Sequence, residues 1–102
     1  MARLIWTEPA LSDLDAIADY IALDNPQAAR ALVRRIYRHV GQLARYPNSG
    51  TRIPEFDSPA HRQLIEPPCR VLHRIGADTV HVLHVMRTER LLRPEWLRSL
   101  PD

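Results

Sequence analysis

Two short runs of alternating apolar residues in the second half of the chain constrain the fold more than any other stretch. The runs cover residues 70–75 and 79–87, and a polar break at residues 76–78 separates them. Period-two alternation rich in β-branched residues on both sides of a short break is typical of an antiparallel hairpin. The sequence therefore predicts two adjacent strands in which Ile75 lies opposite Val80.

The predicted register gives the hairpin two chemically different faces. The almost apolar face holds Val71, His73, Ile75, Val80, Val82, His84 and Met86. The other face holds Arg70, Leu72, Arg74, His81, Leu83, Val85 and Arg87. A shift by one residue would bring arginines onto the buried face of one strand, so the pattern favours this register. The apolar face needs a cover, and His73 and His84 are expected to be hydrogen-bonded structural histidines beneath it.

The first half of the chain supplies that cover as two predicted helices that follow a short strand at residues 2–6. Thr7 is suited to cap the first helix, and Asn25-Pro26 combines a capping residue with a proline suited to the first position of the second helix. Apolar residues recur at helical spacing in both segments: Ala10, Leu14, Ile17 and Ile21, then Ala29, Leu32, Val33, Ile36, Val40 and Leu43. Because the connection is so short, the helices are expected to pack antiparallel.

Charge is divided sharply between these two segments. Residues 8–25 contain five acidic residues and no basic one, whereas residues 26–52 contain six arginines and no acidic residue. One interpretation is a pair of solvated faces that attract each other. The alternative is a nucleic-acid contact along Arg30, Arg34 and Arg38. Tyr37 is the single aromatic residue among these arginines, which disfavours binding of single strands.

The remaining segments complete an α+β arrangement. Residues 47–60 are rich in turn residues and predict a long irregular loop, residues 61–66 predict a strand, and Pro67-Pro68 predicts a turn before the hairpin. We expect one domain over residues 1–102: an N-terminal strand, then a helical hairpin packed on an antiparallel sheet that a C-terminal three-strand meander completes. The tail at residues 93–102 is expected to form a short helical turn or to be flexible.

Composition excludes several classes of chemistry. The fourteen basic residues are all arginine, so no mechanism can use a lysine. Cys69 is the single cysteine, which excludes an internal disulfide and a cysteine zinc cluster. Since no carboxylate lies near the histidines in sequence, we expect no metal and no cofactor. No apolar run approaches the roughly 20 residues of a membrane span, and we expect a cytoplasmic protein.

The order and spacing of short motifs along the chain resemble the RelE/ParE superfamily of bacterial toxins. The long helical hairpin with Asn25-Pro26 most resembles the ParE branch. The motifs that carry the resemblance are Trp6-Thr7, Ala10, Asp13-Leu14, Ile17, Tyr20-Ile21, Asn25-Pro26, Ala28-Ala29, Leu43, Pro47, Gly50, Arg62-Gln63-Leu64, residues 70–75 and residues 82–85.

This resemblance implies the toxin of a type II toxin–antitoxin system, neutralised by a ParD-like antitoxin in a hetero-oligomer. RelE-like members cut mRNA on the ribosome with basic residues of the sheet face, whereas ParE-like members are described as inhibitors of DNA gyrase. Of the positions at which the ribonuclease branch carries its functional groups, only Arg70 clearly matches. Cleavage needs proton transfer, for which a permanently charged arginine is poorly suited.

We therefore expect a non-enzymatic toxin with no catalytic residues that acts on DNA gyrase and arrests growth. The alternative is a ribosome-dependent mRNA endoribonuclease with an altered site made of Arg70 and His81. A third possibility is a toxin relic that is kept only to bind its antitoxin.

Arginines beside exposed apolar side chains are typical of protein interfaces. The arginine-bearing sheet face is therefore predicted to bind the antitoxin or the target. The residues assigned to this surface are Arg62, Arg70, Leu72, Arg74, Leu83, Val85 and Arg87. The competing interpretation is that the tail around Trp96 and Leu97 folds back and covers this face.

Overall fold

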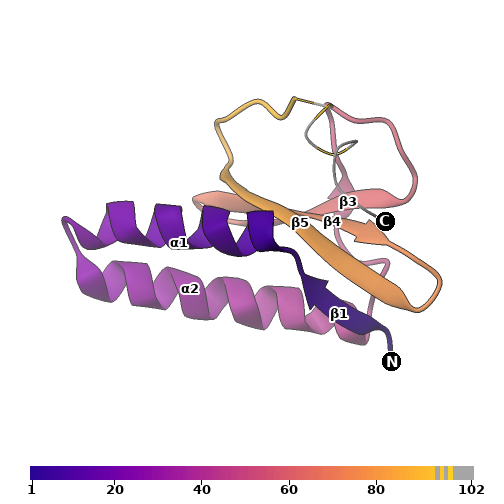
Figure 1. Ribbon diagram of the computed structural model, residues 1–102, viewed down its shortest axis with the longest axis horizontal. Coiled ribbons are helices and arrows are strands. Elements are labelled where there is room, and N and C mark those ends of the chain that lie inside the picture. Colours follow the sequence, from indigo (N-terminus) through magenta and orange to yellow (C-terminus); the bar gives the residue numbers. More distant parts are fainter. Residues whose placement is uncertain (94, 96, 98–102) are drawn as a thin grey trace.

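The computed structural model describes residues 1–93, 95 and 97, and it places two helices on one face of a five-stranded sheet (Figure 1). The order of elements is β1 (Arg3–Trp6), α1 (Glu8–Ala22), α2 (Pro26–Gly41), the 3-10 turn η1 (Gln42–Ala44), β2 (Thr51–Arg52), β3 (His61–Glu66), β4 (Cys69–Ile75) and β5 (Thr79–Arg87). The α+β class and the helical hairpin are confirmed. None of the described helices has the length and apolar content needed to cross a bilayer.

The sheet has the order β1-β5-β4-β3-β2. The C-terminal meander of β3, β4 and β5 is antiparallel, as expected, but β1 pairs with β5 in parallel. The sheet is therefore mixed: the predicted antiparallel pairing holds from β2 to β5, and β1 joins the edge of the sheet in parallel. The parallel pairing of β1 has a topological reason. Because α1 and α2 run antiparallel, α2 returns the chain to the end of the sheet at which it started. The two-residue strand β2, inside the predicted loop, was also not expected.

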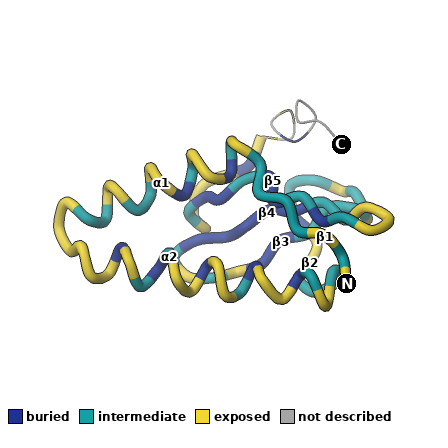
Figure 2. The backbone as a smooth tube through the Cα atoms, turned by 60° about the horizontal axis from the view of Figure 1, so that its bottom comes forward, coloured by how far each residue is buried: buried dark blue, intermediate teal, exposed yellow. Residues whose placement is uncertain are grey.

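Both helices begin at the predicted caps. The Thr7 hydroxyl accepts a hydrogen bond from the Ala10 N–H at 3.3 Å, and the Asn25 side-chain oxygen accepts one from the Ala28 N–H at 3.0 Å. The apolar stripes of the helices meet the sheet in the first core, and in Figure 2 the buried residues lie mainly along β3, β4 and β5 and at intervals on the helices. Its buried members are Ala10, Leu14, Leu32, Ile36, Val40, Leu43, Leu64, Cys69, Val71, Val80, Val82 and Val85.

A β-bulge changes the faces of the hairpin. Ile75 lies opposite Val80, as predicted, but the register shifts between Leu72 and His73, so that His73 faces Val82 and Leu72 faces His84. Leu83 is the extra residue of β5 and has no paired residue on β4. An extra residue on one strand reverses the alternation beyond it. The faces predicted for Val85 and Met86 were therefore wrong: Val85 joins the first core, and Met86 lies on the opposite face.

The face of the sheet away from the helices carries a second core. Its buried residues are Ile53, Leu72, Leu83, Met86, Leu92 and Leu97, with Phe56 packed against them. The predicted open apolar surface at Leu72 and Leu83 is therefore wrong, since these side chains are 0% and 1% exposed. The competing interpretation, that the tail folds back over this face, is confirmed at Leu97. Trp96 and most of the predicted helical turn lie outside the described residues.

Candidate functional site

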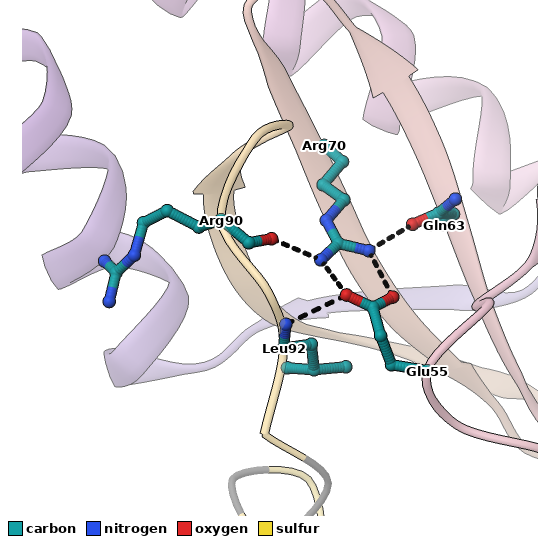
Figure 3. A network of polar contacts seen from close by, with 5 residues as sticks. All are labelled: Glu55, Gln63, Arg70, Arg90 and Leu92. Atoms are coloured by element: carbon teal, nitrogen blue, oxygen red, sulfur yellow. Dashed lines mark hydrogen bonds and ion pairs between the residues drawn. The ribbon is translucent and has the colours of Figure 1, made fainter.

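Arg70, the one residue that matched the ribonuclease branch, lies in a closed polar network (Figure 3). Its side chain is 5% exposed. The guanidinium donates to both carboxylate oxygens of Glu55, at 2.9 and 2.6 Å, to the Gln63 side-chain oxygen at 3.0 Å and to the Arg90 carbonyl at 2.8 Å. The Leu92 N–H also donates to Glu55, at 2.9 Å. Arg70 thus fixes two irregular segments on the sheet: the loop that contains Glu55 and the segment after β5.

The electrostatics of this network favour a permanent ion pair. The hydrogen bond from Arg70, together with a smaller contribution from the Leu92 N–H, lowers the pKa of Glu55 to about 2 against an opposing effect of burial. A bidentate arginine–carboxylate pair is among the stronger polar contacts in proteins. Because the guanidinium is buried and already bonded to internal acceptors, the network leaves it unable to reach an external anion without rearrangement.

The alternative ribonuclease hypothesis places Arg70 and His81 in one site, but the fold does not bring these two residues together. His81 lies opposite Arg74, as predicted, whereas Arg70 lies opposite Met86. Arg70 and Arg74 are four residues apart on β4, so the positions of Arg70 and His81 are separated by about 13 Å along the strands. His81 is half-buried, and its Nδ1 has no hydrogen-bond partner in the described part of the chain. The two side chains therefore lie too far apart to act on one phosphodiester.

The other two hairpin histidines differ from each other. His84 Nδ1 lies 2.8 Å from an Asp13 carboxylate oxygen, which agrees with the prediction of a hydrogen-bonded histidine. His73 is 0% exposed, and neither ring nitrogen has a hydrogen-bond partner among the described residues, so the same prediction is wrong for His73. Burial and then the nearby Arg62 guanidinium lower its pKa to about 4. His73 is therefore neutral near neutral pH.

Among the described residues, no strand lies beside one edge of the second half of β5. β1 pairs with β5 only as far as Trp6 and Val82, after which α1 begins. The Asp13 carboxylate of α1 lies at this edge, where it accepts the Val85 N–H at 3.1 Å in addition to contacting His84. One α1 side chain thus satisfies a backbone donor that a neighbouring strand would otherwise have bonded.

Three adjoining depressions follow this edge and form a groove between α1 and β5, which we call the α1–β5 groove. Their volumes are about 280, 150 and 180 Å³. The groove is lined by Asp13, Ala16, Ile17, Tyr20, His84, Val85, Met86, Arg87 and Arg90. Figure 3 shows the Arg90 side chain pointing away from the Arg70 network and toward the helices. The lining thus combines small and apolar groups with two arginines, of which Arg87 pairs with Glu89 at 2.7 Å, and with the Asp13 carboxylate, which also bonds within the chain.

The residues predicted from sequence to bind the antitoxin or the target differ in their exposure and surroundings. Arg70, Leu72 and Leu83 are buried beneath the second core or its polar network. Arg62 and Arg74 are partly exposed, and Arg62 donates to the Gly50 carbonyl at 3.4 Å. Val85 and Arg87 line the α1–β5 groove, although the Val85 side chain points into the first core.

The α1 residues of the groove were missed. Asp13 carried a detectable signal, because it lies beside Leu14 on the helix stripe that was predicted to be buried. An acidic residue at the border of such a stripe indicates a specific acceptor role. Arg90 carried no such signal, since its position depends on the path of the chain after β5. In the described part of the chain, no group of three or more His, Cys, Asp or Glu side chains could hold a metal ion.

Comparisons with known proteins agree with this fold. A sequence model of the family described as "ParE toxin of type II toxin-antitoxin system, parDE" matches residues 4–92. The chain is 35% identical to the toxin RelE2 of Caulobacter vibrioides, over 89% of this chain and 100% of that protein. It is 40% identical to the protein named Y4kP of Sinorhizobium fredii, over 86% of this chain and 90% of that protein.

A solved structure of the chromosomal ParDE toxin–antitoxin system from P. aeruginosa contains a chain of similar fold. The TM-score is 0.71 at 31% sequence identity, with 87% of this chain and 98% of that chain covered. The fold is thus that of the RelE/ParE toxin superfamily, with two helices on a mixed five-stranded sheet. Within that class, the chain belongs to the ParE toxin family of type II toxin–antitoxin systems.

Proposed function

We propose that this ParE-family toxin is not an enzyme, that it arrests growth by inhibiting DNA gyrase in the cytoplasm, and that a ParD-like antitoxin neutralises it. The observation that carries the non-enzymatic mechanism is the closed network around Arg70. RNA cleavage requires a base, an acid and a cation near one phosphodiester. Here the matching arginine is buried against Glu55, and the candidate proton-transfer group His81 lies about four strand positions away. Inhibition by binding requires no such constellation.

The α1–β5 groove is the surface proposed for the antitoxin. Ala16, Ile17 and Met86 give it an apolar lining, Tyr20 stands 70% exposed at one end, and Arg87 contributes a cation. Apolar and aromatic contacts with arginines at the rim are typical of protein interfaces. An amphipathic segment with apolar and acidic side chains fits this lining, in the manner of a helix or strand bound in a groove.

The mechanism is tested by assaying purified toxin for both activities. We expect blocked supercoiling by purified gyrase, relieved when the antitoxin is added, and intact reporter mRNA by primer extension during induction. The ribonuclease alternative predicts codon-phased cuts that disappear in His81→Ala. Unimpaired supercoiling together with such cuts would overturn the gyrase proposal, and a chain that binds antitoxin but has neither activity would be the toxin relic.

The groove is tested by placing a carboxylate on its lining. Ala16→Glu puts a charge on the apolar part of the groove at an exposed helix position, so that antitoxin affinity should fall by at least tenfold while the melting temperature changes little. Ala28→Glu is the matched control, because it makes the same substitution at an exposed helix position outside the groove. Equal antitoxin affinities for both variants, measured by calorimetric titration, would exclude the groove as the antitoxin site.

A further inference from the structure

The outer face of α2 carries a row of unpaired arginines, which we call the α2 arginine row. Arg30, Arg34 and Arg38 recur every four residues, so their Cα atoms follow one another at roughly 6 Å along the helix. Arg45, just after η1, continues the row. The Ala2 N–H donates to the Ala44 carbonyl at 2.8 Å, which joins this end of the row to the residue before β1. The row thus follows the length of α2 and ends near β1.

These arginines are exposed and make no contacts that would neutralise them. All four arginines of the row are exposed. Within the described part of the chain, none of them forms a side-chain hydrogen bond or ion pair. No ion pair among the described residues joins α1 to α2, although α1 is acidic and α2 basic. The interpretation of the two charged segments as mutually attracting faces therefore lacks the expected contacts.

The row extends beyond the shallow apolar groove between the helices that Arg30 and Arg34 border. Next to Arg38, Tyr37 is 44% exposed and packs its ring on Trp6 with the centroids 4.7 Å apart, and next to Arg45, Tyr46 is 59% exposed. Protein interfaces are organised around buried apolar and aromatic anchors. Because the arginines continue past this groove to Arg38 and Arg45, the row matches a ligand that presents regularly spaced negative charge along its length. Double-stranded DNA is such a ligand, with one charge per roughly 1.7 Å of helix axis.

We propose that the α2 arginine row binds the phosphate backbone of double-stranded DNA without sequence preference. The choice of DNA rests on the proposed function, since an inhibitor of gyrase acts where duplex DNA is bound. The row lies on the helical layer, away from the second core, and the α1–β5 groove does not include its arginines. The toxin would therefore hold the DNA beside its target through contacts that position it but read no bases.

The test compares two double variants that lose the same charge. Arg38→Gln/Arg45→Gln removes two members of the row, and both positions avoid the shallow apolar groove between the helices that Arg30 and Arg34 border. Arg52→Gln/Arg93→Gln is the control, because both arginines are exposed and lie outside the row. Binding of each free toxin to a labelled random-sequence 30-base-pair DNA is measured by fluorescence anisotropy at several salt concentrations, without gyrase.

We expect the row variant to bind DNA at least tenfold more weakly than the control, and its plot of log affinity against log salt to be shallower by about two. Circular dichroism should show unchanged helix in both variants. Equal DNA binding by the two variants would overturn the proposal, as would tighter binding of an RNA duplex than of DNA. Because gyrase is absent from this assay, failure here leaves the supercoiling result to judge the gyrase proposal on its own.

Discussion

The two faces of the sheet are covered in different ways. On one face, two capped helices lay continuous apolar stripes over Val71, Val80 and Val82. On the other face, single apolar residues from the loop and the segment after β5 converge on Leu72 and Leu83, around a buried ion pair. The first cover is regular secondary structure, and the second consists of irregular chain held by side-chain contacts.

This difference indicates that the two cores depend on different forces. The first core gains stability mainly from the burial of many apolar side chains, and His73, opposite Val82, makes this face sensitive to mild acid. The second core depends on Arg70 and Glu55, because loop backbone without a ladder of hydrogen bonds must be fixed by side chains. Removal of one partner from such a pair leaves a buried charge. The two faces should therefore respond differently to truncation, to loss of charge and to acid.

The largest expected effect is in the first core. Ile36 is 0% exposed, so Ile36→Ala should lower the free energy of unfolding by about 2–5 kcal/mol through lost burial and a residual cavity. Urea denaturation measures this change. Ile65→Ala makes the same substitution at a 45% exposed position of β3 and should cost less than about 1 kcal/mol. Similar losses in both variants would contradict the assignment of Ile36 to the core.

A smaller effect is expected in the second core. Glu55→Gln leaves the Arg70 guanidinium buried without its carboxylate, and we expect a loss of about 3 kcal/mol, near the lower end for broken buried pairs because Glu55 is partly exposed. Faster hydrogen exchange at Leu92, whose N–H bonds to Glu55, should accompany this loss. The control is Asp57→Asn, which removes the exposed partner of Arg52 and should leave stability unchanged. Unaltered protection at Leu92 would show that Glu55 does not hold this segment.

The smallest expected effect comes from His73. Its folded pKa of about 4 lies below the ordinary value of 6.5, so the unfolded chain binds more protons as the pH falls through 6.5 toward 4. Stability should therefore fall by about 2 kcal/mol between pH 7 and pH 5. The pKa of Glu55 is also lowered, but from 4.5 to about 2, so its contribution is lost only at more acidic pH.

Chemical denaturation at pH 7, 6 and 5 checks this assignment. His73→Leu removes the titrating group from the buried position, so the variant should be less sensitive to pH over this range. His81→Leu, on the same hairpin but only half-buried, is the control and should keep the dependence of the parent protein. If His73→Leu retains the full loss between pH 7 and pH 5, another group is responsible.

The sequence predicted the parts of the fold that short-range physics specifies. Thr7 and Asn25 cap helices through contacts within three residues, and the pairing of Ile75 with Val80 follows from a short turn. The bulge at Leu83 was not predictable, because one extra residue in an apolar strand leaves no local signal. The same limit applied to the parallel partner of β5, which depends on the path of the whole chain.

The candidate site was only partly predictable for a related reason. The surface assigned to the antitoxin was derived from a regular alternation, and the bulge broke that alternation before Val85. Glu55 lies in the irregular loop 15 positions before Arg70, with β3 between them, so no periodic pattern indicates their pairing. The α2 arginine row, in contrast, was visible at once, because both its spacing and its lack of acidic neighbours lie within one helix.

The Arg70 network also bears on how related toxins can differ in chemistry. A guanidinium bonded to both oxygens of Glu55 is an anion site that already contains its anion, supplied by the same chain. A chain with a small neutral residue at position 55 would keep the arginine and lose its internal ligand, which opens the same position to a phosphate. Two members of such a superfamily can therefore carry an identical arginine and differ in activity, because in one of them the site is occupied from within.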